Sequence, residues 1–336
     1  MRGYQGVLPR PPSLEDESYL SFMEAVRNHN ILNLFPKIAA FAHEPSAEED
    51  SRVRVWKRLM RSQQQQTWDK LQRSFSAQRD TYEAELAAAE HTRPGRLHYT
   101  PSFEVPAYAT LDIHLQPGGY VGDSLAGYVF HHGTKVFYQG ANDQDELHQQ
   151  VVDFVSAPEE GEVRRVLDLG CSIGQCTTAL KRRFPEAEVT GLDVGLPLLR
   201  YAHKRAVDLD FDVHFRQGLA EDTGLPSGQY DVILAYILFH EVPERLFKVI
   251  LAEVARLLRP GGRFTIIDAP NSRNLPAANQ LWLKFDALYN CEPYSPAFVA
   301  SDFQALLRGA GLRVLESKST PTFLHCTVAQ KDVGVG

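Results

Sequence analysis

Residues 164–184, with the sequence RRVLDLGCSIGQCTTALKRRF, combine a short apolar strand, a loop of small residues and a helix. From this segment to the end of the chain, strand and helix patterns alternate. Such alternation is typical of a parallel sheet with helices on both faces. The sequence therefore predicts an α/β doubly wound sheet, in which a ligand lies beyond the carboxyl ends of the strands, next to the first loop.

The composition of this first loop limits the ligand that it can hold. A nicotinamide cofactor would require glycines at positions 170, 172 and 175, where this chain has Gly170, Ser172 and Gln175. The dinucleotide fingerprint therefore fails. Small side chains still allow a ligand to approach the backbone closely, and Asp168 adds a carboxylate beside the loop.

Four segments in order resemble motifs of the class I S-adenosylmethionine-dependent methyltransferases. The first loop resembles the family's acidic-x-Gly-x-Gly-x-Gly pattern, with Ser172 as the one departure. The segment EVTGLDVG places Asp193 at the end of the second strand, and residues 219–221 resemble the family's segment before the fourth strand. LLRPGGRFTIID then resembles the turn and fifth strand. The resemblance covers about residues 140–330 and is nearest to ubiquinone-biosynthesis-like small-molecule methyltransferases.

The resemblance implies a Rossmann-like, mostly parallel sheet of seven strands and S-adenosyl-L-methionine as the cofactor. It implies that Asp168 lies near a ligand amine and that Asp193 accepts hydrogen bonds from both ribose hydroxyls. Leu219 stands where many members carry an aspartate that contacts the adenine amino group, so backbone groups would read the ring. The predicted cofactor-binding residues are Asp168, Gly170, Cys171, Ser172, Gly174, Asp193, Val194, Leu219, Ala220, Glu221, Tyr236 and Tyr138.

The strand DVILAYILFHEV is predicted to bring residues 236–241 to the reactive end of the cofactor. Positioning supplies most of the catalysis in an in-line methyl transfer, and a base helps only where the acceptor loses a proton. His240 is the best base candidate because imidazole titrates near neutral pH; the alternative is that it shapes the pocket. Tyr236 and His114 complete the predicted catalytic residues.

Histidines before residue 140 raise the question of a metal. Asp112 and His114 share one face of a strand expected in LDIHLQPGGY, and His131 and His132 follow. Their spacing matches no standard metal signature. The prediction is therefore that no metal is bound and that these residues line a substrate pocket.

Residues 1–139 resemble no known family and are predicted to form a mainly helical extension with a short β or lid element, ahead of a cofactor-binding domain over residues 140–336. Helical periodicity runs from residue 13 to 41 and is interrupted at Pro36. A capping box at residues 46–49 predicts a long helix with an apolar stripe. The stripe needs a partner surface, either the first helices, the cofactor domain or a second subunit, and a homodimer is preferred. A further strand is expected in KVFYQG.

Composition restricts the partners. The net charge of −7 argues against a nucleic-acid footprint, and no apolar run approaches the length of a membrane span. The four cysteines show no paired CxxC spacing. The chain is expected to be cytoplasmic, with neither nucleic acid nor membrane as a partner.

The leading functional hypothesis is S-adenosylmethionine-dependent O-, N- or C-methylation of a small, aromatic or polyketide-like metabolite of secondary metabolism. One alternative is a protein of the same fold that binds the cofactor and catalyses a non-methylating reaction, or only binds. The other is a protein or nucleic-acid methyltransferase.

Overall fold

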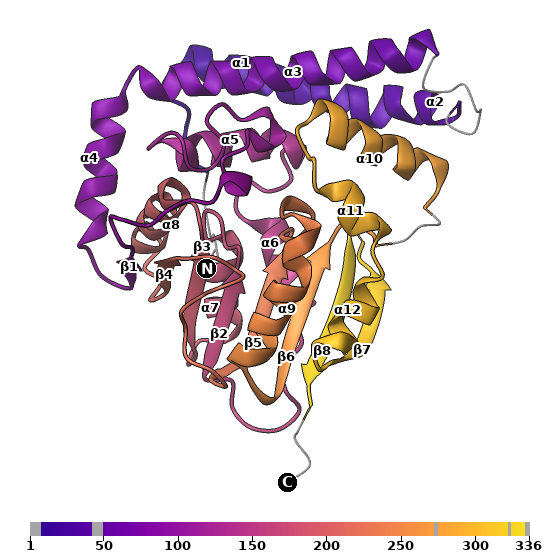
Figure 1. The fold of residues 1–336 in the computed structure, drawn as a ribbon. Coiled ribbons are helices and arrows are strands. Elements are labelled where there is room, and N and C mark those ends of the chain that lie inside the picture. The colour runs from indigo at the N-terminus through magenta and orange to yellow at the C-terminus, as the bar shows by residue number, and fades with distance from the viewer. Residues whose placement is uncertain (1–7, 42–49, 272–274, 322–323, 333–336) are drawn as a thin grey trace.

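The computed structural model describes residues 8–41, 50–271, 275–321 and 324–332. Its centre is an eight-stranded sheet with strand order β1-β4-β3-β2-β5-β6-β8-β7 (Figure 1). Neighbouring strands pair in parallel from β1 to β6, while β8 is antiparallel to both β6 and β7. The predicted doubly wound α/β fold is confirmed. The strands are β1 Arg96–His98, β2 Arg165–Leu169, β3 Glu188–Asp193, β4 His214–Gln217, β5 Tyr230–Tyr236, β6 Leu258–Asp268, β7 Leu312–Ser319 and β8 His325–Lys331.

The sheet has one strand more than the seven predicted. The additional strand β1 comes from the N-terminal extension and pairs in parallel with β4. Gly95 precedes it with φ +81°, and a Cβ atom there would lie 2.2 Å from the carbonyl oxygen of Val213. Glycine therefore lets the extension approach the edge of the sheet. A strand of three residues has too little sequence for a period-2 pattern to reveal it.

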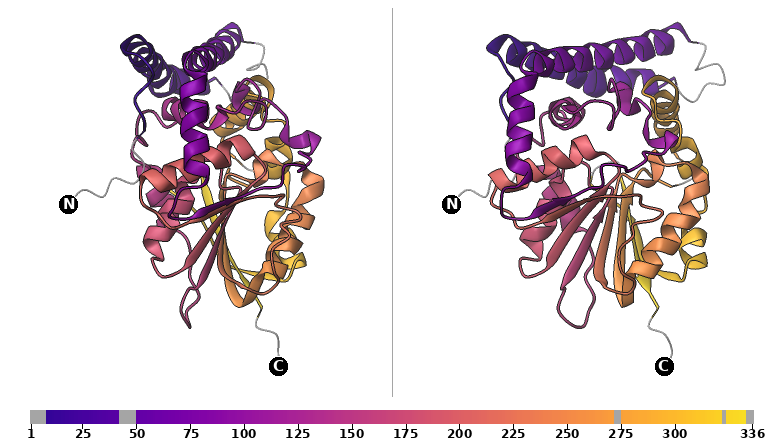
Figure 2. Two further views of the ribbon diagram at one scale, coloured as in Figure 1. Left: turned by 90° about the vertical axis from the view of Figure 1, so that its left-hand side faces the viewer. Right: turned by 60° about the vertical axis from the view of Figure 1, so that its left-hand side comes forward.

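Helices cover both faces of the sheet (Figures 1 and 2). Successive side chains of a strand point to opposite faces of the sheet. In β2, Leu167 therefore lies in the buried cluster under α9, whereas Val166 lies in the buried cluster under α7 and α8. The helices that pack on or beside the sheet are α6 Glu146–Asp153, α7 Gln175–Arg183, α8 Leu196–Asp208, α9 Glu244–Leu257 and α12 Phe303–Gly309. α6 directly precedes β2 in the sequence.

A helical cap lies over the carboxyl ends of the strands (Figure 2). Most of it comes from the N-terminal extension, and the rest comes from the segment that follows β6. The two parts meet through aromatic rings, with the centroids of Phe35 and Trp282, and of Trp56 and Phe285, each 5.1 Å apart. The cap contains α1 Leu14–His29, η1 Asn30–Leu34, α2 Phe35–Ala39, α3 Ser51–Ser76, α4 Arg79–Glu90, η3 Ala107–Ala109, η4 Ile113–Leu115, α5 Ala126–Phe137, α10 Ala277–Tyr289 and α11 Ser295–Ala300.

The strands predicted in residues 111–120 and 135–140 are wrong. The first segment holds the short helix η4, and the second begins in the last turn of α5. A Cβ atom on Gly127 would lie 2.3 Å from Tyr201 Cβ, and one on Gly133 would lie 1.9 Å from the Trp68 ring. Gly127 and Gly133 therefore let α5 pack closely against α8 and α3.

The apolar stripe predicted for one long helix runs over two helices, α3 and α4. Trp56, Met60 and Trp68 are buried within this one chain. The capping box at residues 46–49 lies outside the described residues; Asp50 caps α3 by accepting a hydrogen bond from the Arg52 N–H at 2.7 Å. The chain itself thus supplies the partner surface that the stripe needs. The homodimer stays a prediction, and the stripe no longer supports it.

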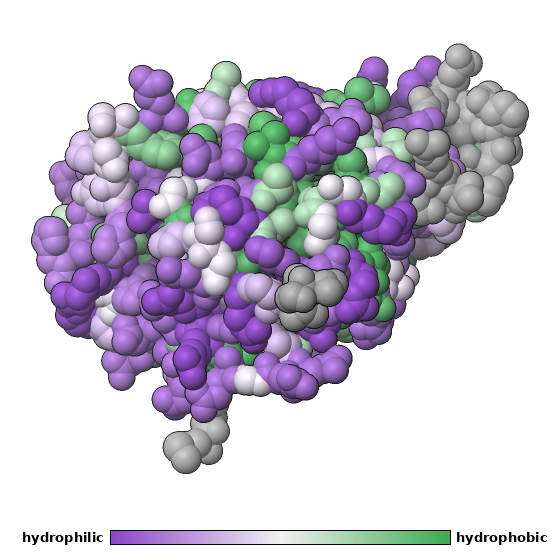
Figure 3. All heavy atoms as spheres, turned by 60° about the horizontal axis from the view of Figure 1, so that its bottom comes forward, coloured by the Kyte–Doolittle hydropathy of each residue, from purple (hydrophilic) through white to green (hydrophobic). Residues whose placement is uncertain are grey.

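Figure 3 shows the molecule turned so that the lower end of Figure 1 comes forward. The face seen there is mostly hydrophilic, and hydrophobic side chains show between the hydrophilic ones. Within the described ranges, none of the helices is both long and apolar enough to cross a bilayer.

Candidate functional site

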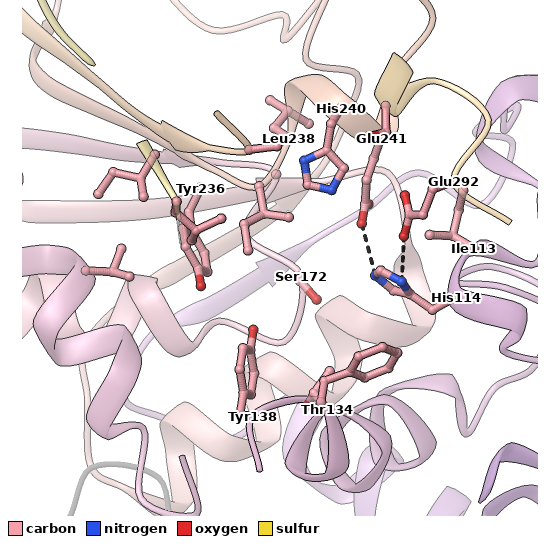
Figure 4. Close-up of a pocket in the computed structure, with 18 of the residues that line it drawn as sticks. Ile113, His114, Thr134, Tyr138, Ser172, Tyr236, Leu238, His240, Glu241 and Glu292 are labelled. Atoms are coloured by element: carbon pink, nitrogen blue, oxygen red, sulfur yellow. Dashed lines mark ion pairs between the residues drawn. The ribbon is translucent and has the colours of Figure 1, made fainter. Parts of the chain in front are cut away.

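A cavity of about 870 Å³ separates the carboxyl ends of the strands from the cap. The loop after β2 and the end of β5 form its floor, and residues of α5 and α10 contribute to its walls. Doubly wound sheets bind ligands at this edge. The structure therefore places the cavity where the alternating pattern predicts a ligand (Figure 4).

Asp193 ties the first loop to the end of β3. Its Oδ2 accepts the Ser172 N–H at 2.9 Å and its Oδ1 accepts the Gly195 N–H at 2.8 Å. The Ser172 backbone has φ 49°, the left-handed region that a glycine would adopt more easily. Burial raises the pKa of Asp193 to about 6, although the backbone N–H donors oppose the shift. Asp193 thus shapes the loop and presents its carboxylate to the cavity.

Asp168 lies at the end of β2 and is also buried. Its Oδ2 accepts a hydrogen bond from the Thr177 hydroxyl at 2.6 Å. Burial raises the pKa of Asp168 to about 7, with Thr177 opposing and Asp193 adding to the shift. A ligand ammonium group beside Asp168 would favour the ionised carboxylate.

Most of the predicted cofactor-binding residues share the cavity wall. The members that line it are Asp168, Gly170, Cys171, Ser172, Asp193, Val194, Tyr138 and Tyr236. Gly174, Leu219, Ala220 and Glu221 are not among the lining residues. A Cβ atom on Gly174 would lie 2.6 Å from the Phe215 ring, so this glycine serves the packing of the loop on β4. Glu221 accepts a hydrogen bond from the hydroxyl of Tyr108 at 2.7 Å, and Tyr108 does line the cavity.

His240 forms a pair with Asp268, a residue that sequence reasoning missed. Asp268 ends β6, the parallel neighbour of β5, and its Oδ1 contacts Nδ1 of His240. Its Oδ2 accepts the Phe239 N–H at 2.9 Å, which fixes the carboxylate. Burial lowers the pKa of His240, but the Asp268 carboxylate more than offsets this and raises it to about 9. With Nδ1 engaged, Nε2 is the ring nitrogen left to exchange a proton with a ligand.

His114 also lines the cavity, although the strand predicted to carry it does not exist. Side chains of α3 hold its backbone, because Gln64 and Trp68 donate hydrogen bonds to its carbonyl oxygen at 3.1 and 2.7 Å. Its ring lies between two carboxylates, with Nε2 3.5 Å from Glu241 and Nδ1 2.5 Å from Glu292 (Figure 4). Burial lowers the pKa of His114, and the two carboxylates raise it well above its usual range.

The metal set considered from the sequence does not assemble. His131 contacts the hydroxyl of Tyr201 at 2.8 Å, and His132 contacts the carbonyl oxygen of Pro9 at 2.8 Å. Asp112 lies outside the cavity lining. Among the described residues, His114 is instead grouped with Glu241 and Glu292. No sequence motif marked Glu292, because the cap brings it to the cavity from a segment with no recognisable pattern.

Comparison with known proteins gives the family. Residues 166–262 match the family model described as "Methyltransferase domain". The fatty-acid O-methyltransferase of Mycolicibacterium smegmatis is 36% identical over 141 residues, which cover 40% of this chain and 49% of the relative. The demethylmenaquinone methyltransferase of Thermus thermophilus is 32% identical over 107 residues, covering 32% and 48% respectively.

The ubiquinone biosynthesis O-methyltransferase of Aeromonas salmonicida is 34% identical over 104 residues, covering 31% of this chain and 42% of that protein. The chain spans about half the length of the curated relatives it matches. The match to the family model falls on the doubly wound sheet, and the relatives agree with the predicted resemblance. Residues 166–262 thus form a methyltransferase domain, and the relatives support the class I S-adenosylmethionine-dependent type for it.

Proposed function

We propose that the chain catalyses S-adenosylmethionine-dependent methylation of a hydroxyl group on a small, largely apolar acceptor. The observation that carries this proposal is the His240–Asp268 pair, which lies in the same cavity as the loop after β2 and Asp193. A base is required where an acceptor hydroxyl must lose its proton. The pair therefore suits an acceptor that loses a proton, and the names of two relatives, both O-methyltransferases, favour oxygen among the O-, N- and C-methylation that the sequence left open.

Asp168, Asp193 and the loop between them would hold the cofactor. Asp193 faces the cavity with a carboxylate that can accept ribose hydroxyls while it keeps its two backbone donors. Asp168 would meet the ligand ammonium group, and the small residues of the loop allow close approach. When bound, the cofactor supplies an electrophilic methyl group on a sulfonium.

His240 would act on the acceptor. With a pKa of about 9, the neutral form of His240 is the minor form at neutral pH, and it is this form whose Nε2 would accept the hydroxyl proton while the cofactor would supply the methyl group to the acceptor oxygen. Asp268 orients the ring and stabilises the imidazolium that forms. The cap excludes water that would otherwise solvate the acceptor oxygen.

The part of the cavity under the cap favours an apolar acceptor. Ile31, Phe35, Phe137, Trp282 and Leu283 line it. A volume of about 870 Å³ leaves room for an aromatic or polyketide-like molecule beside the cofactor. One relative's name, fatty-acid O-methyltransferase, is in keeping with an apolar acceptor. A role in secondary metabolism is part of this proposal.

A homodimer is a separate part of the proposal. Phe22 on α1 and Val55 and Leu59 on α3 are apolar and exposed, and they offer a surface for a second copy of the chain.

Incubation with methyl-labelled cofactor and a panel of phenolic, enolic and fatty-acid acceptors tests the proposed function. We expect labelled product and S-adenosylhomocysteine in equal amounts from at least one acceptor. Cofactor binding without any S-adenosylhomocysteine would favour a protein that only binds the cofactor or uses it for another reaction.

Cofactor affinity is predicted to depend on pH through Asp168. Burial raises the pKa of Asp168 to about 7, so the carboxyl becomes protonated as the pH falls through 7. At lower pH, binding of a ligand ammonium group must first release that proton, which weakens the measured affinity. The Kd for S-adenosylhomocysteine should therefore be about tenfold weaker at pH 6 than at pH 8. Calorimetry at both pH values measures the change. Asp168→Asn should bind more weakly than wild type with a nearly flat pH profile; an unchanged slope in this variant would assign the dependence to another group.

A further inference from the structure

Three ionisable side chains from distant parts of the sequence converge on one wall of the cavity (Figure 4). His114 comes from η4, Glu241 from the short helix η5 Phe239–Glu241 after β5, and Glu292 from the turn between α10 and α11. One potential ligand atom of each lies within 4.8 Å of those of the other two. The cap and the sheet together therefore build this cluster.

Glu292 is the most deeply buried member of the cluster. Its side chain is 4% exposed, and neither carboxylate oxygen accepts a hydrogen bond from the described residues. Its Oε1 lies 2.5 Å from His114 Nδ1 and forms an ion pair with that ring when the ring is protonated. A buried carboxylate is costly unless a cation compensates it, and either a protonated His114 or a metal ion can do so here.

The surroundings add negative charge. Glu241 accepts a hydrogen bond from the Tyr120 hydroxyl at 3.2 Å, and this neutral donor does not compensate its charge. A third acid, Asp286, lines the same cavity, and burial together with the charge of Glu292 raises its pKa to about 7. The two carboxylates beside the His114 ring suit a divalent cation that takes the place of the His114 proton.

We propose that His114, Glu241 and Glu292 bind a divalent metal ion, in contrast to the sequence prediction of no metal. One imidazole and two carboxylates suit Mn²⁺, Fe²⁺ or Zn²⁺, whereas Mg²⁺ and Ca²⁺ favour oxygen ligands throughout. Three protein ligands leave further coordination positions, and all three ligand residues line the cavity.

The open positions point to a class of acceptor. This step rests on the proposed function. The acceptor would carry a second oxygen, as a carbonyl or hydroxyl group, beside the hydroxyl that is methylated. The second oxygen would coordinate the ion while His240 receives the proton of the methylated hydroxyl. The cluster and His240 line the same cavity, and Glu241 directly follows His240 in the sequence. The ion would thus orient the acceptor.

Metal binding can be measured without any acceptor. The full chain, freed of metal with a chelator, is titrated with MnCl₂ by calorimetry and by the electron paramagnetic resonance signal of free Mn²⁺, and then with ZnCl₂. We expect one ion per chain. Glu292→Gln and His114→Gln each remove a proposed metal ligand. Loss of a residue that only hydrogen-bonds to a ligand already weakens metal affinity by about 10- to 100-fold, so the Kd of these variants should weaken by at least that much. Glu221→Gln is the matched control, since it makes the same carboxylate-to-amide change outside the cavity lining, and its Kd should stay within a few-fold of wild type.

Titration of S-adenosylhomocysteine into every variant shows whether the cofactor site is intact and separates the two proposals. If the wild type binds S-adenosylhomocysteine but neither Mn²⁺ nor Zn²⁺, the metal site is refuted and the proposed methyltransferase stands. Equal metal affinity in Glu292→Gln and wild type would also refute it. If the metal binds in the expected way and S-adenosylhomocysteine does not, the metal site stands and the proposed function fails.

Discussion

Replacement of His240 by alanine is expected to lower kcat by about 10²-fold or more, which is the usual contribution of a general base. The reason is geometric, because Asp268 holds Nδ1 and leaves Nε2 as the proton acceptor in the cavity. The adenosine contacts are proposed for residues of β2, β3 and their loops. The Kd for S-adenosylhomocysteine should therefore change little, and the loss should fall on kcat.

His240→Gln is the matched control for shape, since it keeps a polar side chain of similar reach and cannot serve as the base. Steady-state kinetics and calorimetry on both variants distinguish the two roles that the sequence left open. A glutamine variant with nearly wild-type turnover would show that His240 only shapes the pocket. An alanine variant with normal turnover would remove His240 from the mechanism.

Asp193→Ala is expected to weaken S-adenosylhomocysteine binding by about 10- to 150-fold, the equivalent of about 1.5–3 kcal/mol for hydrogen bonds to a charged group. The carboxylate would lose its proposed ribose contacts, and the Ser172 and Gly195 N–H groups would lose their acceptor. Calorimetry measures the change, and thermal unfolding of the same sample checks that the fold persists.

Glu221→Gln is the matched control for this prediction. The family resemblance assigned Glu221 to the cofactor, but the structure places it outside the cavity lining, with Tyr108 as its partner. Glutamine retains an oxygen that can accept this hydrogen bond, so the affinity should stay close to that of wild type. Wild-type affinity for S-adenosylhomocysteine in Asp193→Ala would contradict the ribose assignment. A large loss of this affinity in Glu221→Gln would show that Glu221 contributes to cofactor binding after all.

The core of the fold could be predicted because its signals are local. Apolar strands, turn glycines and amphipathic helices alternate from residue 164 onward, and each element can be recognised within a few residues. The same periodicity predicted the helical character of the N-terminal extension, where α1 and α3 form, but the segment of residues 111–140 could not be predicted in this way. Gly127 and Gly133 serve contacts of α5 with Tyr201 and Trp68, and these contacts depend on the tertiary structure.

The same distinction holds for the site. Asp168 and Asp193 end parallel strands and His240 follows the end of a third, so their place at one edge of the sheet follows from the fold class. Asp268 ends β6 and could have been found by the same rule. Glu292 could not, because only the packing of the cap brings it to the cavity.

A single-turnover reaction tests most directly the central claim that one cavity both holds the cofactor and deprotonates the acceptor. The enzyme is loaded with methyl-labelled S-adenosylmethionine and mixed with an acceptor identified from the panel. We predict one S-adenosylhomocysteine for each labelled product, with the rate lost in His240→Ala while its affinity for S-adenosylhomocysteine is retained. An enzyme that binds S-adenosylhomocysteine tightly but never transfers the label to any acceptor of the panel would contradict the account.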